Sequence, residues 1–143
     1  MSTGGKTDIT CECGCQFTAW LWQSVSVSRE PELLETILGG SMNVVTCPCC
    51  SSRFHVEVPF LYHDMHAKEW IWVYPLSFDK RSDEVHAKVE AMWRDLVTGM
   101  PPGVKEIYQK QYRVLVLFGM DALVHYLRSN LGGNGDESGP DQS

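Results

Sequence analysis

The hydrophobic positions of this 143-residue chain change their period about half-way along it. In the first half they form short apolar or alternating runs between polar, Gly and Pro residues, a pattern typical of β-strands. We expect strands over residues 17–27, 43–46, 53–58, 60–62 and 70–74, the last two forming a hairpin with a polar tip at residues 63–69. One short helix is expected between Pro31, which suits a first helical turn, and Gly39-Gly40.

In the second half the apolar period becomes that of a helix. A helix capped by Ser82 and ending before Gly99 carries one apolar stripe, formed by Val85, Val89, Met92, Trp93, Leu96 and Val97. After a Pro-Gly loop, residues 112–118 form a continuous apolar run that predicts a strand buried on both faces. A last helix is expected from about Met120 to Leu131, ending at Gly132-Gly133.

The two ends of the chain differ in composition from the rest. Residues 1–8 and 132–143 are rich in Gly, Ser, Asp and Asn, and have too little apolar surface to offset the entropy of ordering, so we expect flexible tails. Residues 9–131 are then one domain, with a strand-rich part at 9–75 and a part of helices and one strand at 76–131. A chain of this length buries roughly 68% of its unfolded surface, which is enough for a real core.

Six cysteines lie in two tight clusters, residues 11–15 and 47–50. Residues Thr10–Phe17 align with Thr46–Phe54 as a half-repeat, Thr-Cys-x-Cys-Gly-x-x-Phe against Thr-Cys-Pro-x-Cys-Ser-x-x-Phe, with one residue deleted in the first copy. This alignment selects four metal ligands: Cys11, Cys13, Cys47 and Cys50. Four thiolates match the tetrahedral preference of Zn²⁺ and leave no open position for a substrate. The predicted fold is therefore α+β, with an N-terminal zinc-ribbon-like antiparallel sheet, C-terminal helices and one buried strand.

Other uses of the cysteines stay open at this point. Disulfides are common in small secreted proteins, but the chain starts without an apolar export segment, which favours a reduced, cytoplasmic setting. An iron–sulfur cluster uses the same ligand type. Because the gap between Cys11 and Cys13 is tight, Cys15 competes with Cys13 as the second ligand of the first knuckle. With Cys13 as ligand, we expect Cys15 and Cys49 to be spare residues, either small buried hydrophobes or redox-sensitive thiols.

Charge and hydropathy narrow the class of partner. The formal net charge is −6, and no cluster of Lys and Arg suggests a surface that follows phosphates, so nucleic acid is not the expected partner. The longest apolar runs, at residues 114–120 and 70–74, are much shorter than the ~20 residues that span a bilayer. We expect a cytoplasmic protein that contacts another protein or associates with itself.

The hairpin tip contains the one other constellation with acid–base character, Tyr62-His63-Asp64-Met65-His66. An imidazole oriented by a carboxylate is a common catalytic arrangement, but neighbouring residues on a strand point to opposite faces. We therefore interpret Asp64 as a turn residue that binds its own backbone, and expect no catalytic residue in the chain. The isolated His55, His86 and His125 are expected to be solvated.

Aromatic residues are concentrated in the expected hairpins. If Trp22 and Trp72 point away from the ribbon core, they form, together with Tyr62, His63 and Asp64, an exposed patch of the kind that binds partners. Alternatively, the C-terminal helices cover that face.

Several of these motifs together resemble the CpXC family, a bacterial and archaeal family of uncharacterised function named for its Cys-Pro-x-Cys motif. The similar segments are Ile9–Gly14, Cys47–Cys50, Pro59–Asp64 and Arg113–Leu123. The resemblance covers about residues 9–131 and implies a metal-binding fold and a cytoplasmic setting, without an assigned activity. The chain departs from the pattern at Glu12, where proline is expected, and at Ser51, where glycine usually follows the knuckle.

The leading functional hypothesis is a non-enzymatic zinc-binding module that acts through protein contacts, as an accessory or adaptor subunit. One alternative is a transcription-associated zinc ribbon that contacts polymerase or nucleic acid. The other is a metal-dependent hydrolase that uses His63, Asp64 and His66.

Overall fold

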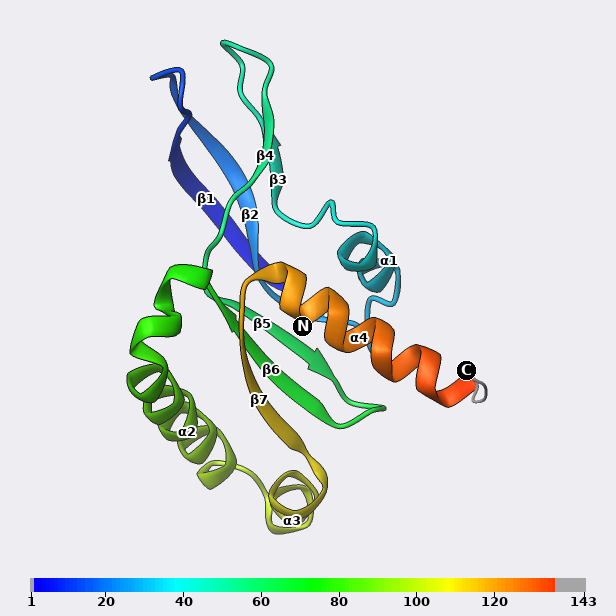
Figure 1. Cartoon of the computed structure of the whole chain (residues 1–143). Coiled ribbons are helices and arrows are strands. Elements are labelled where there is room, and N and C mark those ends of the chain that lie inside the picture. The colour runs from blue at the N-terminus through cyan, green and yellow to red at the C-terminus, as the bar shows by residue number, and fades with distance from the viewer. Residues whose placement is uncertain (1, 136–143) are drawn as a thin grey trace.

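The computed structural model describes residues 2–135 (Figure 1). The strands are β1 (Thr3–Thr10), β2 (Gln16–Ser26), β3 (Val44–Thr46), β4 (Arg53–His55), β5 (Phe60–Asp64), β6 (Glu69–Tyr74) and β7 (Arg113–Phe118). The helices are α1 (Glu32–Leu38), a 3₁₀ helix (Leu76–Arg81), α2 (Ser82–Thr98), α3 (Pro102–Gln111) and α4 (Met120–Gly135).

Five strands form one mixed sheet in the order β1-β2-β5-β6-β7. The hairpins β1–β2 and β5–β6 are antiparallel, whereas β2 pairs with β5 and β6 pairs with β7 in parallel. Strands β3 and β4 form a separate antiparallel ribbon. The α+β class is confirmed, and the predicted hairpin at residues 60–74 does extend the sheet that carries the first knuckle.

Helices cover both faces of the β5-β6-β7 part of the sheet (Figure 1). On one face, α1 and α4 pack against a core that includes Phe60, Tyr62 and Ile71. On the other face, α2 packs Val85 and Val89 against an aromatic layer from β6 and β7. Because most of β5 and β6 is covered on both sides, their residues are apolar except at the hairpin end, where His63, Asp64 and Glu69 lie.

A third core cluster lies apart from the helices, between the β1–β2 hairpin and the β3–β4 ribbon. Its buried residues are Ile9, Leu21 and Val45, and the half-buried Phe17 and Phe54 pack against them. This small core supports the two cysteine loops at the end of the molecule that projects away from α2 and α3 (Figure 1).

Two expectations about loops and tails are wrong. Residues 3–8 are not an irregular tail, because they form most of β1 and pair with β2 between Thr18 and Ser24. The expected Pro-Gly loop is largely the helix α3, with Pro102 at its first position. Local composition did not predict either element, since each depends on a neighbour, β2 for β1 and α2 for α3.

Other boundaries differ as well. Ser82 lies inside a continuous helical stretch, because the 3₁₀ helix runs directly into α2, and no side chain caps that helix. Helix α4 continues through Gly132-Gly133 to Gly135, and the remainder of the expected tail, residues 136–143, lies outside the described residues. Strand β7 is an edge strand, so its apolar residues are half-buried rather than buried on both sides. Within the described residues, no helix has both the length and the apolar character needed to cross a membrane.

Candidate metal centre

The two cysteine loops have the same backbone construction. In the first, the Gly14 N–H donates to the Cys11 carbonyl, and in the second the Ser51 N–H donates to the Cys47 carbonyl, each at 2.9 Å. Gly14 and Ser51 both have positive φ, 92° and 62°. The loops therefore have equivalent turns, as the half-repeat predicts, with the first loop one residue shorter.

These loops bring four sulfurs together. The Sγ atoms of Cys11, Cys13, Cys47 and Cys50 all lie within 4.8 Å of one another. The Cys11–Cys50 and Cys13–Cys47 pairs are each 3.6 Å apart. A tetrahedral ion with metal–sulfur distances of ~2.3 Å separates its ligand sulfurs by roughly 3.8 Å, so the four side chains fit a single ion.

The second loop is held against the sheet by Asn43, which is buried and has a φ of 57°. Its side-chain Oδ1 accepts the Trp22 N–H at 2.8 Å, and its Nδ2 donates to the Trp22 carbonyl at 3.0 Å. The amide thus pairs with β2 as another strand would. The rings of Phe17 and Phe54, which follow the two cysteine loops in the sequence, meet edge to face with centroids 6.4 Å apart. Together these contacts fix the distance between the two loops.

The electrostatics of the cluster favour a bound cation. Backbone N–H groups of Cys50 and Cys49 lower the pKa of the buried Cys47 thiol to about 7. A backbone N–H also lowers the pKa of Cys11, but burial and the neighbouring sulfurs outweigh it and raise that pKa to about 12. Four crowded thiols therefore do not all ionise by themselves, and a divalent ion supplies the charge that holds four thiolates together.

Cys15 and Cys49 do not join the four-sulfur group. They form a disulfide with a Cα–Cα distance of 6.2 Å, which links the tips of the two loops. Both cysteines thus lie outside the four-sulfur group, but they are bonded to each other and are not single buried hydrophobes. The sequence alone did not predict this disulfide, because Cys15 and Cys49 are 34 positions apart. They come into contact only when the two loops fold side by side.

Ser51 occupies a backbone conformation that side chains disfavour, with a φ of 62°. We expect Ser51→Gly to stabilise the metal-loaded protein by about 0.5–1 kcal/mol, because glycine has no Cβ to strain there. Gly14→Ala is the matched control at the equivalent position, where φ is 92° and no atom lies within 4 Å of an added Cβ, so backbone strain alone should destabilise that variant. Urea unfolding measures both changes; a loss of stability in Ser51→Gly contradicts the expectation.

The hairpin tip has the predicted turn construction. Asp64 Oδ1 accepts the backbone N–H groups of His66 and Ala67, at 2.9 and 3.1 Å. His63 lies on the other face, where its Nε2 is 2.9 Å from the Tyr112 hydroxyl and burial lowers its pKa. His63 and Asp64 thus do not form an acid–base pair, and the interpretation of Asp64 as a turn residue is confirmed.

The expected aromatic patch is only partly present. Tyr62 is buried, with 1% of its surface exposed, so its place in an interaction surface is wrong. Trp72 packs into the layer under α2, and Trp22 is half-buried beside the α1 and α4 core. The exposed tryptophan is Trp20, at 50%. Strict alternation along β2, with Phe17, Ala19 and Leu21 inward, is the sequence signal that identifies Trp20 as outward-facing.

One comparison with known proteins decides the family. The family model described as CpXC protein matches residues 9–127, most of the chain, and this range contains all six cysteines. The chain belongs to the CpXC family. No curated protein and no solved structure matches it. In this CpXC protein the Cys-Pro-x-Cys segment, Cys47–Cys50, contributes two of the four sulfurs, and the other two come from the first loop. The family match and the sulfur geometry thus agree on a cysteine cluster that can hold a metal.

Proposed function

We propose that this CpXC protein is a non-enzymatic zinc-binding module that acts in the cytoplasm through protein contacts, as an accessory or adaptor subunit. The observation that supports this proposal most strongly is the four-sulfur cluster. Four protein ligands fill the coordination sphere of a tetrahedral ion, so the metal has no open position at which to activate water or a substrate.

The spacing of the sulfurs favours a single ion. All four sulfurs lie within 4.8 Å of one another, as the ligands of one tetrahedral ion do. In a cluster of two or four iron atoms, cysteines bound to different irons are farther apart than this. Zn²⁺ is the proposed ion because four thiolates and a closed tetrahedral site are typical of structural zinc. A bound ion of this kind contributes ~10–16 kcal/mol in small zinc domains and would stabilise the β1–β2 and β3–β4 loops.

The surface also supports a role in protein contacts. Several large apolar side chains are exposed by more than 40%: Trp20, Met65, Leu76, Leu96, Val104 and Ile107. The net charge of −6 favours protein over nucleic acid as the partner. A hydrolase is the weaker alternative, because among the described residues His63, Asp64 and His66 do not form a ligand group.

Native mass spectrometry of the protein, purified gently from its own cells, tests the proposal. One zinc ion per chain and a different protein in stoichiometric amount are the expected result. A chain that carries zinc without any foreign protein contradicts the adaptor role and leaves the metal assignment intact. Iron, or two metal ions per chain, contradicts the metal assignment. Titration with duplex and single-stranded DNA at low salt tests the alternative of a transcription-associated zinc ribbon. Binding of either DNA would favour that alternative over the adaptor role.

A further inference from the structure

The outer side of β7 pairs with no other strand in the part of the chain that the structure describes. The backbone N–H groups of Arg113 and Gly119 donate to carbonyls on the β6 side, each at 2.8 Å. Because backbone groups alternate in direction along a strand, those of Val114, Val116 and Phe118 point outward. A row of donors and acceptors therefore lies along this edge, ready to pair with another strand.

The two edges of the sheet are built differently. β1, with the sequence TGGKTDIT, carries Lys6 and Asp8 and has a register irregularity at Thr3/Gly4. Charges and irregularities of this kind protect an edge from pairing with another chain. β7, with the sequence RVLVLF, has neither between Val114 and Phe118, and these five apolar residues are all only half-buried. The unprotected apolar edge is typical of a strand that is covered in the functional assembly.

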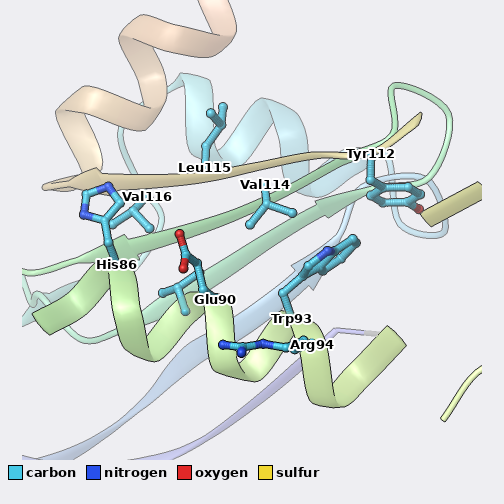
Figure 2. A pocket seen from close by; sticks show the side chains of 9 residues that line it. His86, Glu90, Trp93, Arg94, Tyr112, Val114, Leu115 and Val116 are labelled. Atoms are coloured by element: carbon cyan, nitrogen blue, oxygen red, sulfur yellow. The ribbon is translucent and has the colours of Figure 1, made fainter. Parts of the chain in front are cut away.

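A groove of about 580 Å³ runs beside this edge, between β7 and α2. Figure 2 shows Val114 and Val116 pointing toward α2, while Leu115 points to the opposite face. The groove continues the apolar layer under α2 past the last strand, through Val89 and Trp93. A strand added to β7 would place alternate side chains in this groove.

The apolar composition of this edge indicates what kind of strand can pair with β7. An added strand has the α2 layer on one side and the α4 layer on the other, so it has to be apolar on both faces. β7 itself satisfies this requirement, with Val114, Val116 and Phe118 on the α2 side and Leu115 and Leu117 on the α4 side. Two copies related by a two-fold axis present the same edge to each other, which is the common geometry of homodimers.

We propose that this protein forms a homodimer in which the β7 strands of two copies pair antiparallel and join their sheets into one. Val116 of one copy lies opposite Val116 of the other, so that the outward groups of Val114 and Phe118 pair reciprocally. The pairing involves neither the cysteine cluster nor a foreign partner. The dimer and the adaptor role can therefore be tested independently of each other.

Helix α2 contributes the charges that flank this interface. His86, Glu90 and Arg94 are exposed, are spaced one turn apart, and border the groove in Figure 2. The two-fold axis places the two α2 helices antiparallel on the same face of the joined sheet. His86 packs near Phe118 and Trp93 near Tyr112, so an axis through Val116 passes beside the stretch of α2 between His86 and Glu90. Each Glu90 then lies opposite His86 of the other copy, and complementary polar groups across an interface favour this orientation.

The first test is the mass of the metal-loaded full chain in solution, measured by light scattering over a concentration series. We expect a dimer. Val116→Pro removes an outward N–H without removing a bond to β6, and proline is tolerated at such edge positions. Since two reciprocal hydrogen bonds are lost, we expect the dissociation constant of the dimer to rise at least roughly tenfold. Val116→Ala, which shortens the side chain but keeps the N–H, is the matched control and should remain a dimer.

His86→Glu is a second variant that does not depend on the tolerance of β7 for proline. Residue 86 is exposed, so the change does not affect the core. Acidic residues at both 86 and 90 face each other across the axis and should weaken the dimer. Combining His86→Glu with Glu90→Arg should restore the dimer, because opposite charges then face each other in both copies.

Hydrogen exchange locates the interface directly. The amides of Val114, Val116 and Phe118 should be protected only at concentrations where the dimer forms, whereas those of Leu115 and Leu117, bonded to β6, are protected throughout. A protein that stays monomeric at all concentrations overturns the proposal. So does a dimer in which the three outward amides exchange freely, because its contact then lies elsewhere.

Discussion

Replacing Cys47 with serine is expected to abolish metal binding and to unfold the two cysteine loops. Cys47 is the most deeply buried of the four sulfur-bearing residues, with 1% of its surface exposed, and backbone N–H groups lower the pKa of its thiol to about 7. Serine is a poor ligand for a soft tetrahedral site, so most of the ~10–16 kcal/mol typical of zinc binding is lost. The core cluster at Ile9, Leu21 and Val45 is small and should open without the ion.

Metal analysis measures the metal content of the Cys47→Ser protein, and NMR spectra show whether its cysteine loops are folded. The matched control is the double variant Cys15→Ser/Cys49→Ser, which removes the disulfide and leaves all four proposed ligands in place. We expect this control to keep one metal ion and its fold. A well-folded, metal-free Cys47→Ser protein contradicts the structural role of the metal. Loss of metal in the double variant contradicts the choice of ligands.

The second large effect is expected in the core between the sheet and α4. Ile71, in the middle of β6, is completely buried and belongs to the cluster that contains Phe60 and Leu123. Ile71→Ala leaves a cavity there, and we expect it to lower the free energy of unfolding by about 2–5 kcal/mol. The metal content should not change, because Ile71 lies in a different cluster from the residues that support the cysteine loops.

Urea unfolding followed by tryptophan fluorescence measures this change in stability, with metal content determined on the same samples. Leu96→Ala is the control, since it also truncates an apolar side chain, but one that is 43% exposed. We expect its effect to stay within about 0.5 kcal/mol. Equal losses in the two variants would contradict the argument from burial. Release of metal by Ile71→Ala would show that this core and the one that supports the cysteine loops are not independent.

The candidate site was predictable to a large extent because it is built from two local loops. The half-repeat aligns Gly14 with Ser51, and the structure has positive φ at both positions and equivalent hydrogen bonds after Cys11 and Cys47. The geometry of a tight loop is determined by contacts between residues close in sequence, so the spacing of the cysteines predicts which sulfurs come together. The turn function of Asp64 is local in the same way, since it binds N–H groups two and three residues further along.

Features that depend on distant neighbours were not predictable. The Gly-rich segment at residues 3–8 has little intrinsic tendency to form a strand, and it does so because β2 provides a continuous partner. The Cys15–Cys49 disulfide depends on the meeting of two loops. Tyr62 and Trp72 were expected in one exposed patch, but they lie on opposite faces of the sheet. The helices that cover the two faces place both residues in core clusters.

The sequence by itself determined the α+β class, most of the strands and helices, the pairing of two cysteine knuckles and the turn at Asp64, because each is encoded within a few neighbouring residues. Tertiary structure decided the order of the strands, the parallel pairings of β2 with β5 and of β6 with β7, and the place of β7 at the edge. An apolar run such as Val114–Phe118 shows that a strand needs cover on both sides. Whether a helix, a neighbouring strand or a second copy of the chain provides that cover depends on contacts between segments far apart in the sequence.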